Sequence, residues 1–209
     1  MTEIKHPILY LITRGNATVS NFADAIRQIT ESLRTAVSES VDLVQIREKQ
    51  LPAKLIYELA VSAAEITRGT STRLLINDRP DIALAAGADG VQLPSNSMPT
   101  GVIRQNLPRP FLIGVSTHTV EEAGEAAREG ADFALFGPVF ETPGKDDVQG
   151  IDNLSRVCLQ VAPFPIIAIG GIDTANCRKA VESGASGIAA IRSLASGEGI
   201  RDIRRELNK

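Results

Sequence analysis

The chain has 209 residues, of which 43% are hydrophobic and 22% are charged, and its formal net charge at pH 7 is −3. This length and composition can bury one large core, and the mixed charges provide no basic stripe of the kind that nucleic-acid-binding proteins use. No apolar run reaches the roughly 18 residues of a membrane span, and no signal-peptide pattern is present. We therefore expect a cytoplasmic protein without nucleic-acid or membrane partners.

Short apolar runs alternate with helical patterns along the chain. We expect strands at residues 8–13, 43–47, 73–77, 90–93, 111–116, 133–136, 165–169 and 187–191. Helices are expected at residues 21–37, 52–68 and 80–86, from about residue 119, and between the later strands. The strand runs are apolar at successive rather than alternate positions, which is typical of parallel strands buried on both faces.

Three segments of the chain resemble one another, at residues 87–93, 130–136 and 184–191. Each begins with Gly-Ala, continues through a small polar turn and ends in a short apolar run, as a helix does when it leads into a buried strand. The recurrence favours a single-domain (β/α)8 TIM barrel over residues 1–209, with short loops because this fold typically needs ~250 residues. The alternative, an open doubly wound sheet, usually carries a Gly-x-Gly-x-x-Gly turn after its first strand, which this sequence lacks.

Polar residues follow most of the predicted strands, and in a barrel the carboxyl ends of all strands meet at one mouth. The candidates are Gln45, Arg47, Lys49, Asn77, Asp78, Ser116, His118, Thr142, Lys145, Gly170, Gly171 and Arg192. Such a set of cations, amides, hydroxyls and one histidine would suit a small polyanion that carries a polar heterocycle. The longest predicted loop, residues 137–150, is a candidate lid.

Two of these groups have a direct structural alternative. Gly170 and Gly171 could form a phosphate cradle, because backbone N–H groups approach an anion closely where no side chain intervenes, or they could simply form a turn. Arg47 and Lys49 could both point into the mouth, or could form a surface charge cluster with Glu48. The buried position of Gln45 is harder to dismiss, since a buried amide needs hydrogen-bond partners that a ligand could supply.

Two further groups also remain open on spacing alone. Asn77 and Asp78 could bind a ligand amide and a metal ion, or could cap the helix that begins near Pro80. His118 lies at the rim after the fifth strand, where a neutral imidazole could move a proton near pH 7, or where it could be a capping or solvated residue.

Six segments carry a family resemblance, in the same order along the chain. They are Leu-Tyr-Leu-Ile-Thr at 9–13, Gln-Ile-Arg-Glu-Lys at 45–49, Ile-Asn-Asp-Arg at 76–79, Gly-Val-Ser-Thr-His-Thr at 114–119, Gly-Pro-Val-Phe at 137–140 and Ala-Ile-Gly-Gly-Ile at 168–172. Together they resemble the thiamine phosphate synthase and thiazole tautomerase (TenI-like) superfamily across almost the whole chain. The resemblance also implies a homodimer.

The resemblance implies roles for the candidate residues. In the synthases, an aminopyrimidine diphosphate loses pyrophosphate and the nitrogen of a thiazole phosphate attacks the resulting cation. The pyrimidine and its diphosphate would be held by Gln45, Arg47, Lys49, Asn77, Ser116 and Lys145. The thiazole phosphate would be held by Thr142, Gly170 and the backbone of Ile191 and Arg192, with Gln92 and Gly171 as further substrate-binding residues. Asp78 would be one Mg²⁺ ligand.

The segment after the fourth strand departs from the synthase pattern. Synthases usually read His-(apolar)-Gly-Gln-x-Asp there, and the final aspartate is the second metal ligand. This chain reads Gln-Leu-Pro-Ser-Asn-Ser at 92–97, so Ser97 stands in the aspartate's place, and a hydroxyl is a poorer Mg²⁺ ligand than a carboxylate.

The segment at 92–97 instead resembles the tautomerase branch, which moves one proton without metal or cofactor. We therefore predict a thiazole tautomerase with His118 as general acid/base and Ser116 as the second catalytic residue. A Mg²⁺-dependent thiamine phosphate synthase is the alternative. A non-catalytic protein that binds thiamine intermediates is the second alternative.

Overall fold

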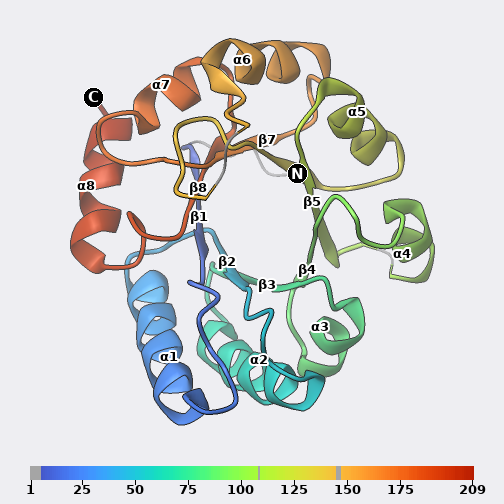
Figure 1. Ribbon diagram of the computed structural model, residues 1–209, viewed down its shortest axis with the longest axis vertical. Coiled ribbons are helices and arrows are strands. Elements are labelled where there is room, and N and C mark those ends of the chain that lie inside the picture. The colour runs from blue at the N-terminus through green and yellow to red at the C-terminus, as the bar shows by residue number, and fades with distance from the viewer. Residues whose placement is uncertain (1–5, 108, 145–146) are drawn as a thin grey trace.

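A closed barrel of eight parallel strands forms the centre of the molecule, in a computed structural model that describes residues 6–107, 109–144 and 147–209 (Figure 1). Each strand pairs with its neighbours in chain order, and β8 closes the barrel by pairing with β1. The strands are β1 (Ile8–Ile12), β2 (Leu43–Ile46), β3 (Arg73–Asn77), β4 (Gly90–Leu93), β5 (Leu112–Thr117), β6 (Phe133–Phe136), β7 (Ile166–Ile169) and β8 (Gly187–Ala190). The predicted (β/α)8 fold is confirmed, and every strand begins and ends within one residue of its predicted bounds.

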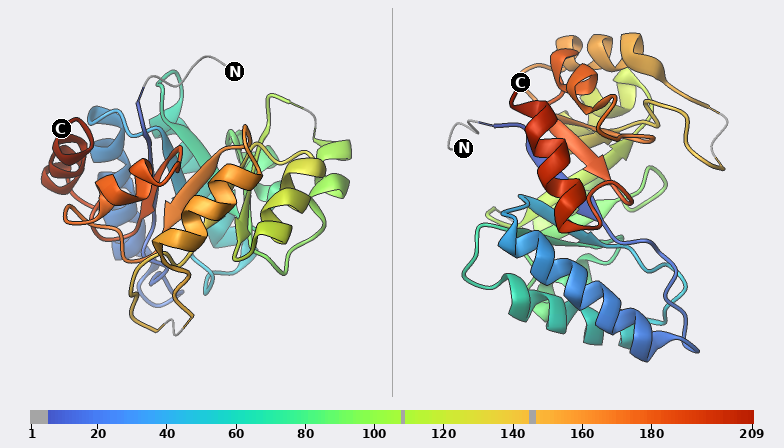
Figure 2. Two further views of the ribbon diagram at one scale, coloured as in Figure 1. Left: turned by 90° about the horizontal axis from the view of Figure 1, so that it is seen from above. Right: turned by 90° about the vertical axis from the view of Figure 1, so that its left-hand side faces the viewer.

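A helix follows each strand and lies on the outside of the barrel (Figures 1 and 2). The helices are α1 (Phe22–Ser38), α2 (Ala53–Thr67), α3 (Pro80–Ala86), α4 (Thr100–Asn106), α5 (Val120–Arg128), α6 (Gly150–Gln160), α7 (Cys177–Glu182) and α8 (Gly197–Leu207). Three of them, α3, α4 and α7, have only six or seven residues, which explains how a short chain completes the fold. No helix among the described residues is long and apolar enough to cross a membrane.

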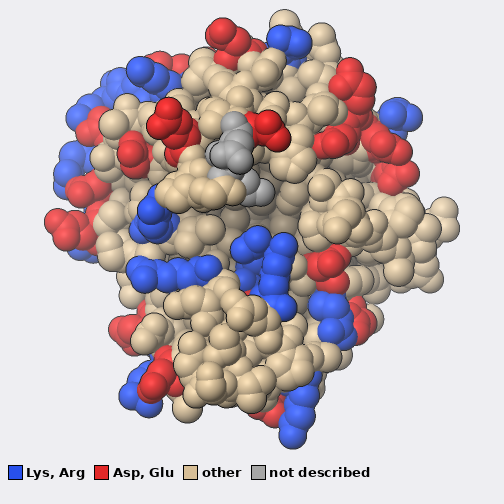
Figure 3. Space-filling model, in the orientation of Figure 1, with Lys and Arg blue, Asp and Glu red and all other residues tan. Residues whose placement is uncertain are grey.

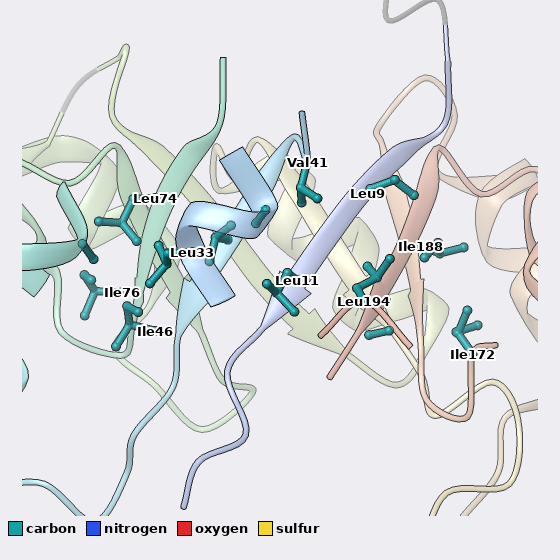
Figure 4. Packing of buried hydrophobic residues seen from close by; sticks show 14 of the residues in the cluster. Leu9, Leu11, Leu33, Val41, Ile46, Leu74, Ile76, Ile172, Ile188 and Leu194 are labelled. Atoms are coloured by element: carbon teal, nitrogen blue, oxygen red, sulfur yellow. The ribbon is translucent and has the colours of Figure 1, made fainter. Parts of the chain in front are cut away.

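Two layers of apolar side chains cover the two faces of the strands. In β1, Tyr10 and its alternate neighbours point into the barrel, where they pack with residues such as Phe133. The intervening Leu9 and Leu11 pack outward against the helices in a larger cluster that includes Leu33 of α1 (Figure 4). Because both faces are buried, successive strand residues must be apolar, which is the pattern that the sequence shows.

At the amino-terminal end of the barrel, the same aspartate-to-backbone hydrogen bond recurs three times among the described residues. Asp42, Asp89 and Asp132 each stand directly before an even-numbered strand and accept a hydrogen bond from a backbone N–H of the preceding strand. These donors are the N–H groups of Leu9, Leu74 and Ile113, at 2.9, 2.8 and 2.8 Å. Two of the three similar segments in the sequence contain one of these aspartates. The similarity of those two segments therefore has a structural cause, because the aspartate links two neighbouring strands.

Candidate functional site

The carboxyl ends of the strands open onto a cavity of about 800 Å³. Basic side chains gather across the middle of this face, as Figure 3 shows. The lining contains most of the residues that the sequence singled out. These are Gln45, Arg47, Lys49, Asn77, Ser116, His118, Thr142, Gly170, Gly171, Ile191 and Arg192. Residues far apart in the chain therefore meet at one mouth, while their individual roles stay predictions.

Gln92 and Asp78 are not in this lining, and a third predicted residue lies outside the described part of the chain. Gln92 is only 1% exposed and lies beneath the mouth, where its Nε2 donates a hydrogen bond to Ser116 Oγ at 3.2 Å. Asp78 is exposed beside the lining residue Asn77 rather than in the cavity wall. Lys145 lies outside the residues that the structure describes.

The end of β2 shows why two cations face the mouth. In the near-extended segment after Ile46, Arg47 and Lys49 both line the cavity, and the intervening Glu48 points the other way. Glu48 is 3% exposed, and its carboxylate accepts hydrogen bonds from the backbone N–H groups of Gly15 at 3.1 Å and Ala17 at 2.8 Å. The alternative of a surface charge cluster is therefore wrong, because Glu48 is buried under the β1–α1 loop.

The charge of the cavity lining is positive overall. Arg47, Lys49 and Arg192 contribute three cations, while Glu141 and Asp173 contribute two carboxylates. Within the described part of the chain, the guanidinium groups of Arg47 and Arg192 form no ion pair or side-chain hydrogen bond. Guanidinium groups in a concave site attract an anionic ligand when, as for Arg47 and Arg192 among the described residues, no carboxylate is paired with them.

Two glycines after β7 are required by close packing with the β6–α6 loop. Gly170 and Gly171 have φ angles of +99° and +64°, which side-chain-bearing residues rarely adopt. A Cβ on Gly170 would lie 2.5 Å from Pro138 Cα, and one on Gly171 would lie 2.4 Å from the carbonyl oxygen of Glu141. The backbone N–H of Gly171 has no acceptor among residues 6–107, 109–144 and 147–209, which leaves it able to donate to a bound anion.

The loop that these glycines contact projects from the carboxyl end of the barrel, opposite the start of β1 (Figure 2). It is anchored at its start, since the N–H groups of Val139 and Phe140 donate to Ile169 O at 2.8 Å and Gly170 O at 3.0 Å. Thr142 lines the cavity from this loop and donates its hydroxyl hydrogen to Phe140 O at 2.9 Å.

His118 is held in a defined tautomer. Its Nδ1 lies 2.6 Å from the carbonyl oxygen of Gly137, which accepts only, so Nδ1 carries the hydrogen and Nε2 is left as a basic acceptor. The cap of α5 is Thr119, whose Oγ1 accepts from Glu122 N at 3.1 Å. The carboxylate of Glu122 in turn accepts from the backbone N–H of His118 at 2.6 Å. His118 is therefore not the capping residue, and its ring lines the cavity.

The start of α3 is not capped by Asn77 or Asp78, which was one alternative role for these two residues. The residue at the N-cap is Arg79, and no side-chain capping bond forms there. Its guanidinium donates to Asp81 at 2.5 and 2.8 Å, and this hydrogen-bonded pairing lowers the pKa of Asp81. Neither Asn77 nor Asp78 caps the helix, so both are available for other contacts.

Asp78 is paired with the residue that departs from the synthase pattern. Ser97 Oγ donates a hydrogen bond to the Asp78 carboxylate. Asp78 has a φ of +56°, and its N–H donates to Gln92 O at 2.9 Å. Among the residues that the structure describes, no cluster of three or more His, Cys, Asp or Glu is placed to hold a metal ion. Within the described residues, a metal ion bound at Asp78 would therefore take its further ligands from neutral oxygens such as that of Ser97, or from a substrate or water.

A buried network beneath the mouth contains one residue that the sequence did not single out. The hydroxyl of Tyr10, a fully buried side chain, lies 3.4 Å from Gln45 Oε1 and 3.3 Å from Gln92 Oε1. Gln45 Nε2 then donates to Asn77 Oδ1 at 3.0 Å. The partners of buried Gln45 are thus inside the protein. A hydroxyl in a strand buried on both faces must find a partner, and that was the available signal for Tyr10.

Comparison with known proteins gives a consistent result. Residues 9–194 match the family described as thiamine monophosphate synthase. The thiamine-phosphate synthase of Methanoculleus marisnigri is 40% identical over 176 residues, covering 83% of this chain and 82% of that protein. The thiamine-phosphate synthase of Caldanaerobacter subterraneus subsp. tengcongensis is 36% identical over 187 residues, covering 87% of each. A solved thiamine phosphate pyrophosphorylase from Pyrococcus furiosus superposes with a TM-score of 0.82 at 31% identity, covering 96% of this chain and 95% of that one.

Proposed function

The chain belongs to the thiamine monophosphate synthase family, and we propose that it joins an aminopyrimidine diphosphate to a thiazole phosphate with release of pyrophosphate. The observation that carries the proposal is a mouth lined by Arg47 and Arg192, whose guanidinium groups have no ion-pair partner among the described residues, together with Gly170 and Gly171. The names of the relatives support the synthase over the tautomerase that the sequence analysis placed first.

In the proposed reaction, the bond between the pyrimidine methylene carbon and the diphosphate oxygen breaks, and its electron pair leaves with pyrophosphate. The lone pair of the thiazole nitrogen forms the new C–N bond to the same carbon. Negative charge grows on the leaving diphosphate, so cations fixed nearby stabilise the transition state more than the ground state. Arg47 and Lys49, two residues apart on one wall, are placed for that role.

The second phosphate belongs to the thiazole substrate. Gly170 and Gly171 bring the backbone close to the cavity, and the N–H of Gly171 is available as a donor. Loops after the seventh and eighth strands of such barrels frequently hold phosphate. We place the thiazole phosphate there, with Arg192 and Thr142 beside it, so that the two substrates meet between β2 and β7.

The residues near Asp78 fit a magnesium ion that takes part of its coordination from the substrate. Mg²⁺ is commonly held by one or two carboxylates together with substrate phosphates, so the single carboxylate of Asp78 meets the lower requirement. Ser97 uses its hydroxyl hydrogen on Asp78 and presents a neutral oxygen to the same place. When bound, Mg²⁺ would neutralise charge on the diphosphate.

The decisive experiment is a two-substrate assay with and without Mg²⁺. Aminopyrimidine diphosphate and thiazole phosphate should yield thiamine phosphate and pyrophosphate in equal amounts. Ser97→Asp should raise the rate and lower the Mg²⁺ concentration needed, because it supplies a second carboxylate. Calorimetric Mg²⁺ titration in the presence of pyrophosphate gives a readout besides turnover. Absence of product from the wild-type protein at any Mg²⁺ concentration would rule out the synthase.

The tautomerase remains a second candidate because of the geometry at His118. With Nδ1 donating to Gly137 O, Nε2 is free to take a proton from a bound thiazole phosphate. This activity predicts proton exchange with solvent in thiazole carboxylate phosphate, without Mg²⁺ and without the pyrimidine. His118→Asn should abolish that exchange and leave phosphate binding intact. Loss of synthase turnover alone in this variant would assign His118 to the synthase instead.

A further inference from the structure

Five side chains form one continuous hydrogen-bonded chain across the floor of the mouth. Tyr10 stands at its centre, inside the barrel, with Gln45 on one side and Gln92 on the other. The chain ends at Asn77, the last residue of β3, and at Ser116 in β5, and both of these ends line the cavity. The orientation of the two buried amides therefore determines whether Asn77 and Ser116 act as hydrogen-bond donors or acceptors toward a ligand.

The Tyr10 hydroxyl sets that orientation. Burial raises the pKa of Tyr10 well above its usual value, so the group stays a protonated donor. Both glutamine carbonyl oxygens, Gln45 Oε1 and Gln92 Oε1, lie next to it, at 3.4 and 3.3 Å. The single hydrogen of the hydroxyl is shared between these two oxygens, and the N–H₂ end of each amide points outward along the chain, to Asn77 Oδ1 and Ser116 Oγ.

The outward N–H₂ groups fix the hydrogen-bonding sense of the two cavity residues. Asn77 Oδ1 accepts from Gln45, so that oxygen is used inside the protein and the N–H₂ end of Asn77 has no partner in the described chain. Ser116 Oγ accepts from Gln92, which leaves its own hydrogen to donate. Both ends of the chain are thus donors on the cavity side.

We propose that Tyr10 is a positioning residue, whose hydroxyl acts through Gln45 and Gln92 to make Asn77 and Ser116 hydrogen-bond donors to acceptor atoms of the bound ligand. The inference rests on the proposed function for the identity of that ligand. The aminopyrimidine has two ring nitrogens with free lone pairs, which are acceptors of the required kind, whereas the thiazole has one ring nitrogen and needs its lone pair for the new C–N bond. A ligand that presents donors at the same two places would be rejected, because donor would face donor.

The test is Tyr10→Phe, which removes one oxygen and keeps the ring. Without the shared donor, the two amides are free to turn over. We expect the KM for aminopyrimidine diphosphate to rise about 10-fold or more, as for a buried hydrogen-bonding site that loses its pairing. The KM for thiazole phosphate should change less than about twofold. The fold-change in kcat should be smaller than the fold-change in the KM for aminopyrimidine diphosphate. An unchanged pyrimidine KM, or an equal rise in both KM values, would overturn the proposal.

Phe133→Leu is the matched control for a purely structural role. Phe133 packs edge-on against the Tyr10 ring, with centroids 5.9 Å apart and an interplanar angle of 84°, and its side chain has no donor or acceptor with which to join the hydrogen-bonded chain. It should lower Tm without the selective rise in pyrimidine KM, and a rise equal to that of Tyr10→Phe would contradict the proposal. If Tyr10→Phe fails to fold, Gln92→Met interrupts the chain at Ser116 and should raise the same KM.

Binding separates failure of this inference from failure of the proposed function. The aminopyrimidine alcohol, which lacks the diphosphate, probes only the ring contacts, and pyrophosphate probes only the cations. By calorimetry, Tyr10→Phe should weaken the alcohol about 10-fold and leave pyrophosphate unchanged. That result with no turnover in the wild type would remove the synthase assignment and keep the role of Tyr10. Equal binding of the alcohol by both proteins would remove the role of Tyr10.

Discussion

The two ends of the barrel treat their charged residues in opposite ways. At the amino-terminal end, Asp132 accepts from Ile113 N at 2.8 Å and pairs with Arg104 at 2.6 Å and Arg109 at 2.9 Å. At the carboxyl end, Arg47 lines an open cavity and forms no ion pair within the described residues. The charge of Asp132 is paired within the fold, while the guanidinium of Arg47, unpaired among the described residues, is available to a ligand. Substitutions should therefore affect stability at one end and activity at the other.

The largest effect is expected from Arg47→Met at the carboxyl end. Removing a cation aimed at developing charge should lower kcat/KM by about 1,000-fold, the upper range for one lost transition-state donor. Because the Arg47 guanidinium has no hydrogen-bond or ion-pair partner among the described residues, Tm should stay within about 2 °C. Steady-state kinetics and thermal unfolding measure the two quantities. A large fall in Tm with normal activity would reverse the assignment of this end.

Asp132→Asn tests the amino-terminal end. The amide can still accept from Ile113 N, but Arg104, whose side chain is only 14% exposed, loses its counter-charge. Leaving a largely buried charge unpaired should reduce the free energy of unfolding by about 3 kcal/mol, as measured by urea denaturation. The folded variant should keep the wild-type kcat and both KM values. Altered kinetics in the folded protein would show that the two ends are coupled.

Glu48→Gln tests a buried carboxylate that holds the β1–α1 loop next to the cavity. Glutamine can accept from only one of Gly15 N and Ala17 N, so the β1–α1 loop should lose about 1–2 kcal/mol. This loop also contacts Arg47, whose backbone N–H donates to Thr13 Oγ1 at 2.9 Å. We expect the KM for the diphosphate substrate to rise several-fold, together with the stability loss. A change in stability with an unchanged KM would show that Glu48 only stabilises the β1–α1 loop.

Arg73→Met should have the smallest effect. Arg73 pairs with Asp89 at 3.0 Å at the amino-terminal end, but its side chain is 56% exposed. Exposed pairs contribute at most about 1 kcal/mol, and Asp89 keeps its bond from Leu74 N. Urea denaturation should detect a loss below that value, with unchanged kinetics. A loss of stability as large as that of Asp132→Asn would show that the exposure of the arginine does not determine how much each ion pair contributes.

Local sequence patterns were sufficient to predict the barrel. Runs such as residues 133–136 are apolar at every position, which only a strand buried on both faces requires, and the predicted bounds agree with β6. The positions of Arg47 and Lys49 also follow from local geometry, because residues two apart in an extended segment share a face.

Other features depended on contacts between distant parts of the chain. Glu48 looked like part of a surface cluster because its partners, Gly15 and Ala17, are more than 30 residues away and bond through their backbone, which carries no side-chain signal. Tyr10 looked like an ordinary core residue for the same reason. Its partner Gln92 is 82 residues away.

The sequence by itself determined the barrel, the end at which chemistry can occur and several of the polar residues that line the cavity, because strand burial and strand order are encoded in short apolar runs. Only the tertiary structure decided which polar groups are used up inside the protein and which remain for a ligand. It assigned Glu48 to a loop, Gln45 and Gln92 to Tyr10, and the Nδ1 hydrogen of His118 to Gly137 O. Those assignments depend on three-dimensional proximity between strands, which spacing along the chain does not express.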